Sequence, residues 1–207
     1  MNQMPAINPV VPTPAKQRGK VAPYKLAHVN YRTSRYQEMI EWHCKVLEAE
    51  VTLSTPLLTF LTYDDEHHRV AIGHFPDLED QTLTRAGCEH TGYCYETLED
   101  LFATYERLKA EGIEPYWCVN HGGTLSYYYF DPDRNQLELQ VDVFDTVEEL
   151  NDWFRNSDFA MNPVGYKVDP EDLMARYRAG ESRESVLKRP AVAPEDIPAQ
   201  LPPVPRS

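Results

Sequence analysis

Two histidines and one glutamate are the residues of this chain best suited to bind a metal ion: His28, His90 and Glu138. His28 lies in the alternating stretch LAHVNYR, so its side chain is expected on the strand face opposite the apolar residues. His90 lies in the similar stretch HTGYCY, and Glu138 alternates with Leu137 and Leu139. Two neutral imidazoles and one carboxylate form the facial triad that suits Fe(II) and leaves coordination positions open. The sequence therefore predicts an Fe(2+) site.

An internal repeat must position these residues. Pairing each residue with the one 62 positions later aligns His28 with His90 and Tyr31 with Tyr93, and the register continues to Ile113. A single strand histidine is more often structural than metal-bound, and a single strand glutamate is usually solvated. Three ligand-type residues at related positions of a duplicated unit favour the metal site over these structural interpretations.

Each copy of the repeat has the pattern β-α-β-β-β. In the first copy apolar residues recur at helical spacing between Tyr36 and Leu47, and His43 on that stripe is interpreted as packing. In the second copy Thr97 and Asp100 have the spacing of a capping box and begin a helix that ends near Gly112. The remaining strands are expected at about 49–54, 57–63, 67–75, 113–120, 125–131 and 135–142. Neither copy closes a core alone, so their sheets are expected to join around a shared hollow.

Proline-rich segments bound this folded unit and are expected to be extended arms. The predicted parts are an N-terminal arm over 1–22, a module pair over 24–145 (about 24–75 and 88–142), a helical extension over 146–180 with helices at 146–156 and about 169–179, and a proline-rich tail over 182–207. The predicted fold class is therefore α+β, with paired β-α-β-β-β modules and a C-terminal helical extension.

Charge and composition exclude several partners. The 207 residues include 33 acidic and 20 basic ones, and the net charge of −13 repels phosphate backbones and anionic lipid. No apolar run reaches the ~18 residues of a membrane span, and the first residues lack the order of a signal peptide. We therefore expect a cytoplasmic protein that binds neither nucleic acid nor membrane. The four cysteines form no Cys-x-x-Cys pair, which argues against a zinc knuckle or a disulfide scaffold.

The stretches LAHVNYR, HTGYCYETLEDL and SYYYFDPDRNQLELQV resemble the vicinal oxygen chelate superfamily, which includes glyoxalases, antibiotic-resistance proteins and type I extradiol ring-cleaving dioxygenases. The resemblance covers about residues 24–145 and is sharpest for the dioxygenases, in which a tyrosine lies ten residues before the ligand glutamate. Tyr128 occupies that position relative to Glu138. The resemblance implies a catechol-type substrate, O2 and Fe(2+), with the ring cleaved next to its two hydroxyl groups.

The resemblance also implies three catalytic roles. His68, which opens the stretch HRVAI, would be the acid/base residue, with His67 and His74 as alternatives. His121, on the loop before the tyrosine strand, would stabilise charge that develops on dioxygen, and Tyr128 would hydrogen-bond the bound catechol oxygen. Aromatic surface near the hollow is expected from Phe60, Tyr63, Trp117, Tyr127 and Tyr129.

Two other functional classes remain open at this point: a metal-dependent glyoxalase-like isomerase or lyase, and a non-enzymatic small-molecule binding protein. Aligning the last strands of the two copies sets Ala71 at the position of Glu138, where glyoxalase-type isomerases need a fourth ligand. The intact metal triad argues against a protein that only binds. The metal could also be Mn or Zn. Because the chain has one module pair where many extradiol enzymes have two, we expect a homodimer whose pocket walls come from the tail or the partner subunit.

Overall fold

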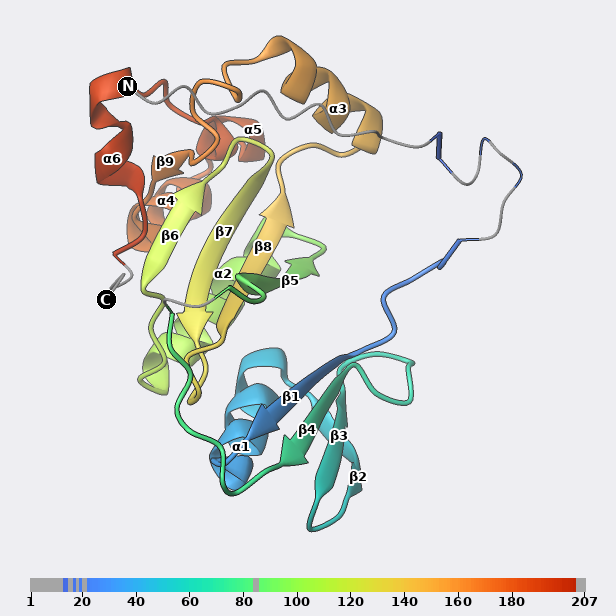
Figure 1. The fold of residues 1–207 in the computed structure, drawn as a ribbon. Helices are drawn as coiled ribbons and strands as arrows, with labels where there is room; N and C mark the ends of the chain where they lie inside the picture. The colour runs from blue at the N-terminus through green and yellow to red at the C-terminus, as the bar shows by residue number, and fades with distance from the viewer. Residues whose placement is uncertain (1–12, 15–16, 18, 20–21, 84–85, 204–207) are drawn as a thin grey trace.

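The computed structural model describes residues 13–14, 17, 19, 22–83 and 86–203 (Figure 1). Most of the predicted N-terminal arm over 1–22 therefore lies outside the described residues. Two modules of one helix and four strands follow each other along the chain, and a mainly helical extension flanks the second module. This architecture confirms the predicted α+β class. Within the described part of the chain, no helix is both long enough and apolar enough to cross a bilayer.

The first module consists of β1 (Val29–Thr33), α1 (Tyr36–Leu47), β2 (Glu50–Ser54), β3 (Leu58–Thr62) and β4 (Val70–His74). Its sheet has the order β1-β4-β3-β2, in which β1 is parallel to β4 and the other pairs are antiparallel. The stripe expected on α1 is the buried one, formed by Met39, Ile40, His43, Val46 and Leu47. The helix covers one face of the sheet, and the other face is left for the site.

The second module consists of β5 (His90–Tyr95), α2 (Leu98–Ala110), β6 (Trp117–Asn120), β7 (Thr124–Phe130) and β8 (Gln136–Asp142). The sheet order is β5-β8-β7-β6-β9, so β5-β8-β7-β6 repeats the order of the first sheet and β9 (Tyr166–Lys167) adds an edge strand. Thr97 and Asp100 form the predicted capping box at the start of α2. Local sequence signals thus place this helix correctly.

Strand register supports the repeat residue by residue. Asn30 of β1 lies opposite Ala71 of β4, and Gly92, 62 positions after Asn30, lies opposite Glu138 of β8. Ala71 therefore occupies in the first module the position that Glu138 occupies in the second. A methyl group therefore occupies the position at which a carboxylate could serve as a fourth protein ligand.

The two modules share one hydrophobic core. A single cluster of buried residues includes Met39 and Val46 from α1 together with Leu101 and Phe102 from α2. Polar contacts add to this joint: Arg107 donates to the carbonyl of Lys45 at 2.6 Å, Arg35 donates to that of Pro132 at 2.8 Å, and the Tyr31 hydroxyl lies 3.2 Å from Thr91 Oγ1. Moving one module against the other would break this core, so the modules form one unit.

The extension contains α3 (Val147–Asn156), β9, α4 (Pro170–Arg178), α5 (Arg183–Leu187), the short 3-10 helix η1 (Pro194–Asp196) and α6 (Ile197–Gln200). Helices α3 and α4 lie where the sequence predicts them. The tail from residue 182 differs from the extended arm that its prolines suggest, because Ser182 caps α5 and Val186 and Leu187 are buried. Apolar burial orders the beginning of this segment despite the prolines that follow.

The buried His43 makes the fold sensitive to acid. Its Nδ1–H donates to the Met39 carbonyl at 2.9 Å, and burial lowers the pKa of the imidazole from 6.5 to about 4. The unfolded chain therefore binds the extra proton between these pH values, so this contribution to stability is complete above pH 6.5 and is lost as the pH falls towards 4. From this group we expect a loss of roughly 3 kcal/mol in the free energy of unfolding.

Urea titrations at a series of pH values measure this loss. His43→Leu is expected to have a flatter stability profile than the wild type across the same interval, whatever its absolute stability. A variant profile parallel to that of the wild type would contradict the assignment.

Candidate functional site

The second sheet brings four of the six predicted site residues together. Glu138 on β8 lies directly opposite Tyr128 on β7, and the Tyr128 hydroxyl donates to Glu138 Oε1 at 2.7 Å. His90, at the start of β5, places Nε2 3.1 Å from Glu138 Oε2. His121, just after β6, places Nε2 2.9 Å from the Tyr128 hydroxyl oxygen. We call this group of four the carboxylate half-site.

Hydrogen bonding keeps Glu138 ionised although its side chain is only 9% exposed. Burial alone would raise the pKa of this carboxyl, but hydrogen bonds from His90, Ser126 and Tyr128 outweigh burial and lower the pKa below its usual value. The same contact with Glu138 raises the pKa of His90. A carboxylate held in its charged form is the state that binds a cation.

Burial acts in the opposite direction on His121 and Tyr128. It lowers the pKa of His121, which favours the neutral imidazole. Burial and the nearby Glu138 charge both raise the pKa of Tyr128, which keeps the hydroxyl protonated. The half-site therefore combines an anionic carboxylate, a phenol that donates a hydrogen bond and a neutral imidazole.

The donor atoms of this half-site fit a first-row metal ion. Imidazole nitrogen and carboxylate oxygen are ligands that Fe(II) accepts. His90 Nε2 and Glu138 Oε2, which lie 3.1 Å apart on neighbouring strands, are donor atoms of these two kinds. Gly92 keeps the space beside the carboxylate open, because a Cβ atom there would lie 3.3 Å from Glu138 Oε2.

The first sheet gathers the other two predicted residues, His28 and His68, into what we call the histidine half-site. Their ring centroids lie 4.5 Å apart, and the His68 ring stacks on Phe60 at 4.1 Å. The strand pairing explains this contact. Val29 of β1 pairs with Val70 of β4, so His28, just before Val29, lies beside His68, two residues before Val70. Burial, followed by the charges of His28 and His67, lowers the pKa of His68.

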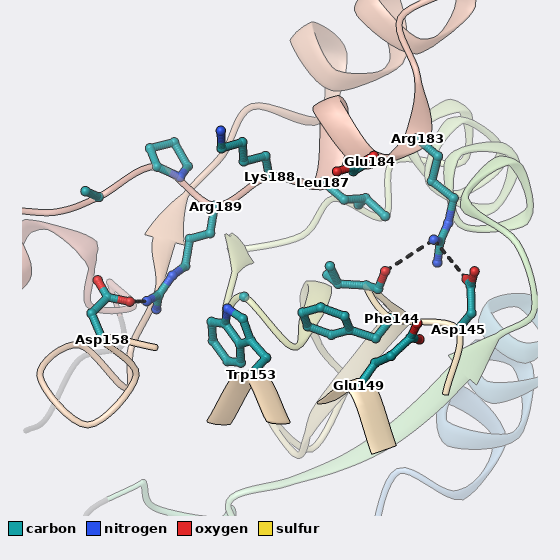
Figure 2. A pocket seen from close by; sticks show the side chains of 14 residues that line it. Phe144, Asp145, Glu149, Trp153, Asp158, Arg183, Glu184, Leu187, Lys188 and Arg189 are labelled. Carbon is teal, nitrogen blue, oxygen red and sulfur yellow. Dashed lines mark hydrogen bonds and ion pairs between the residues drawn. The ribbon is translucent and has the colours of Figure 1, made fainter. Parts of the chain in front are cut away.

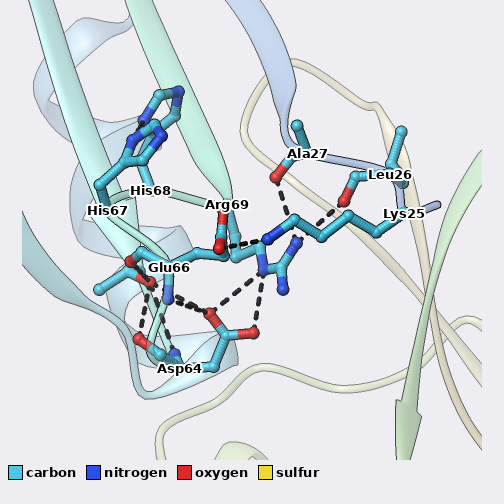
Figure 3. A network of polar contacts seen from close by, with 9 residues as sticks. Lys25, Leu26, Ala27, Asp64, Glu66, His67, His68 and Arg69 are labelled. Carbon is cyan, nitrogen blue, oxygen red and sulfur yellow. Dashed lines mark hydrogen bonds and ion pairs between the residues drawn. The ribbon is translucent and has the colours of Figure 1, made fainter. Parts of the chain in front are cut away.

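A polar network fixes the chain that leads into His28 (Figure 3). Arg69 donates to the Leu26 carbonyl at 2.9 Å and to the Ala27 carbonyl at 3.3 Å. Asp64 holds the same guanidinium group through Arg69 Nε at 2.9 Å. In the figure the rings of His67 and His68 lie together on the other side of the Arg69 backbone. The network thus ties the approach to β1 to the turn that carries both histidines.

The alternatives for the acid/base role differ in their surroundings. His74 lies at the far end of β4, stacks on Tyr36 at 4.9 Å and has Nδ1 3.2 Å from the Pro56 carbonyl. Its contacts are those of a structural residue. His67 contacts His68 but is exposed, whereas His68 is buried at 7% exposure. Geometry therefore favours His68 among the three.

Within one chain the two half-sites do not meet. His28 contacts His68 on the first sheet, whereas His90 contacts Glu138 on the second. Among the described residues, no group of three His, Cys, Asp or Glu side chains is close enough to hold a metal ion. His28 and His90 are both exposed. In the described part of one chain, His28 therefore does not join His90 and Glu138, and the three-residue metal set stays a prediction.

The expected aromatic surface is correct only in part. Trp117 packs against Tyr128 with ring centroids 4.8 Å apart, and Phe60 covers His68. The prediction that Tyr127 and Tyr129 line the hollow is wrong. Their side chains are 0% and 1% exposed and lie in the core on the helix side of the sheet. Alternation along β7 requires this, because Tyr128 takes the opposite face.

No sequence pattern predicts the residues that contact His121 on the side away from Tyr128. Its Nδ1 lies 2.7 Å from the carbonyl of Val164, and Arg189 donates to the His121 carbonyl at 3.3 Å. Both partners come from the C-terminal extension, more than forty positions along the chain. Such contacts follow from tertiary packing and leave no periodic signal.

The fold and this donor set define the class of protein. Residues 25–139 match the Glyoxalase/Bleomycin resistance protein/Dioxygenase superfamily, and the chain belongs to that family. A domain of the same description from Frankia sp. EAN1pec has a similar fold, with a TM-score of 0.50, 17% identity and coverage of 58% of this chain and 99% of that one. The resemblance stated from the sequence is confirmed.

Two curated relatives are similar to most of this chain. Biphenyl-2,3-diol 1,2-dioxygenase 2 of Rhodococcus globerulus is 46% identical over 157 residues, which cover 75% of this chain and 83% of that protein. Biphenyl-2,3-diol 1,2-dioxygenase 3 of the same organism is 38% identical over 167 residues, covering 80% and 88%. Both names describe a 1,2-dioxygenase that acts on biphenyl-2,3-diol.

Proposed function

We propose that this protein is an extradiol ring-cleaving dioxygenase that acts with O2 on a catechol-type, aryl-substituted substrate. The observation that carries the proposal is the carboxylate half-site, in which Glu138 contacts His90 and Tyr128, and Tyr128 contacts His121. The two dioxygenase relatives support the same reaction class. Ala71 opposite Asn30 argues against an isomerase with four protein ligands.

The residues expected to hold the metal are His28, His90 and Glu138, and the metal we propose is Fe(2+). When bound, iron supplies the electron transfer that couples a catechol to dioxygen. The surroundings of the carboxylate half-site favour an ionised Glu138. The same contact raises the pKa of His90, so His90 would release a proton when it binds the metal. Manganese and zinc are the alternatives that metal analysis separates.

The remaining side chains have roles that follow from their positions. Tyr128 donates a hydrogen bond towards the ligand side of Glu138, so it can hold a substrate oxygen there. The neutral His68, next to His28, can accept a catechol proton and return it later. The half-buried Phe60 offers flat apolar surface for the ring, and the buried Trp117 supports Tyr128. His121, which is partly buried, can stabilise developing charge.

A second copy of the chain is the proposed source of the missing ligand. The shared core and the clamps of Arg35 and Arg107 oppose closure of the two half-sites within one chain. In a twofold dimer the histidine half-site of each subunit would face the carboxylate half-site of the other, which forms two equal sites. The first module also exposes large apolar side chains that a partner would cover, namely Val51, Leu53, Leu57 and Tyr63. We therefore propose a homodimer.

Metal analysis of protein purified without oxygen tests the proposed ligands. We expect about one iron per subunit in the wild type and almost none in His90→Ala, because a facial triad loses most of its affinity with one ligand removed. His74→Ala is the matched control and should keep its iron, since His74 contacts Tyr36 outside both half-sites. Full iron content in His90→Ala, or zinc in place of iron in the wild type, would count against the proposal.

We expect the enzyme to act in the cytoplasm. The cysteines Cys44, Cys88, Cys94 and Cys118 are all free thiols, which fits a reducing compartment. The formal net charge of −13 is unfavourable for binding to nucleic acid or anionic membranes. The proposed partners are thus a catechol, dioxygen and a second subunit.

A further inference from the structure

The C-terminal extension contacts His121 on the side away from Tyr128. Nδ1 of His121 lies 2.7 Å from the Val164 carbonyl, while Nε2 lies 2.9 Å from the Tyr128 hydroxyl. A carbonyl oxygen can only accept, so Nδ1 must carry a hydrogen. In a neutral imidazole with its hydrogen on Nδ1, Nε2 has a free lone pair directed at the Tyr128 hydroxyl.

The loop over residues 162–165 is built to bring this carbonyl close. The Asn162 side chain is buried and binds Gly165 twice: it donates to the Gly165 carbonyl at 2.9 Å and accepts from the Gly165 N–H at 3.0 Å. Gly165 has a φ of +102°, and a Cβ atom there would lie 2.3 Å from the Asn120 carbonyl oxygen and 2.8 Å from His121 Cα. Only glycine allows this approach.

Arg189 holds the loop to His121, and its side chain lies beside Asp158 and Trp153 (Figure 2). Its Nη1 donates to the Asn162 carbonyl at 2.9 Å and to the His121 carbonyl at 3.3 Å. The guanidinium group also pairs with Asp158 and lies 5.2 Å from the centre of the Trp153 ring. The Arg189 side chain is only 6% exposed, because these contacts surround it. One buried cation thus connects the loop, the extension and the backbone of His121.

We propose that Arg189 and Asn162 are positioning residues, which fix His121 as the Nδ1–H tautomer and direct its free Nε2 at the Tyr128 hydroxyl. The single hydroxyl hydrogen of Tyr128 has two acceptors within reach, Glu138 Oε1 at 2.7 Å and His121 Nε2 at 2.9 Å. A free Nε2 can accept this hydrogen whenever Glu138 does not, whereas an Nε2–H could not. The catalytic value of this tautomer rests on the proposed dioxygenase function, but the tautomer itself does not.

Nitrogen-15 spectra of histidine-labelled full-length protein test the tautomer directly, with the His121 signal assigned by its loss in His121→Gln. In the wild type we expect His121 to show a protonated Nδ1 and a bare Nε2. Arg189→Met, which keeps much of the apolar stem but removes every donor, should give averaged nitrogen shifts. It should also lower kcat by about 10- to 100-fold, the usual cost of losing an outer partner of a site residue, with little change in KM.

Arg183→Met is the matched control. Arg183 also clamps the extension to backbone carbonyls, donating to Asp142 at 2.6 Å and to Val143 at 3.2 Å, but it does not touch the 162–165 loop. Its variant should leave the His121 spectrum unchanged. Should Arg189→Met fold poorly, Asn162→Asp offers a second test, because it keeps the acceptor for Gly165 N–H and loses the donor.

The possible outcomes separate this inference from the proposed function. A wild-type His121 with a protonated Nε2, or an unchanged spectrum in a folded Arg189→Met or Asn162→Asp variant, overturns the positioning role. The expected spectra together with no oxygen uptake on any catechol would leave the tautomer assignment standing and refute the dioxygenase. A loss of kcat with an unchanged spectrum would also reject the inference.

Discussion

Mixing His28→Ala protein with Glu138→Ala protein is expected to restore activity that neither variant has alone. If each site combines the histidine half-site of one subunit with the carboxylate half-site of the other, a mixed dimer has one doubly defective site and one intact site. After random subunit exchange about half of the dimers are mixed, so the recovered activity should approach about one quarter of the wild-type value. Oxygen uptake with a catechol, followed during exchange, measures the recovery.

A mixture of His90→Ala with Glu138→Ala is the matched control. Both changes lie in the same half-site, which the contact between His90 Nε2 and Glu138 Oε2 defines. Every site of their mixed dimer lacks one ligand, so no activity should return. If the first mixture also stays inactive although differently tagged subunits are shown to exchange, the metal site does not lie between subunits.

Local sequence signals predict most of the fold. The capping box of Thr97 and Asp100 and the buried stripe that includes His43 depend on residues a few positions apart, and both are present. The repeat predicts more, because it transfers register from one module to the other and correctly sets Ala71 at the position of Glu138. These features are fixed by backbone periodicity, which is visible in a single sequence.

The site is harder to predict because it depends on which faces meet. Alternation assigns His28 and His90 to the open faces of their sheets, but it does not say which sheet lies opposite either one. The buried core between α1 and α2 decides this, and it keeps the two half-sites apart within a chain. The same limit applies to the extension, where Arg189 reaches His121 from a segment whose prolines suggest an extended tail.

Replacing His68 by glutamine is expected to slow the chemical step by about 10²- to 10⁴-fold, the range for removing a positioned proton carrier. Iron content and catechol binding should stay close to those of the wild type, because His68 is not among the proposed ligands. His67→Gln is the matched control: it removes the neighbouring imidazole, which is exposed and contacts His68. Single-turnover oxygen uptake by iron-loaded protein measures the effect.

Tyr128→Phe provides the contrast that completes this test. It removes one hydrogen bond to a charged group, worth roughly 1.5–3 kcal/mol, so it should weaken catechol binding and slow turnover more moderately than His68→Gln. Tyr127→Phe, on the opposite face of the same strand, should change neither, since its hydroxyl is buried without a partner among the described residues. A slow His67→Gln enzyme beside a normal His68→Gln enzyme would move the acid/base role to His67. Tyr128→Phe keeps the aromatic ring and loses only the hydroxyl, which is the group that contacts Glu138. If Tyr128→Phe and Tyr127→Phe have equal effects, the Tyr128 hydroxyl has no special role and the residue acts through the packing of its ring.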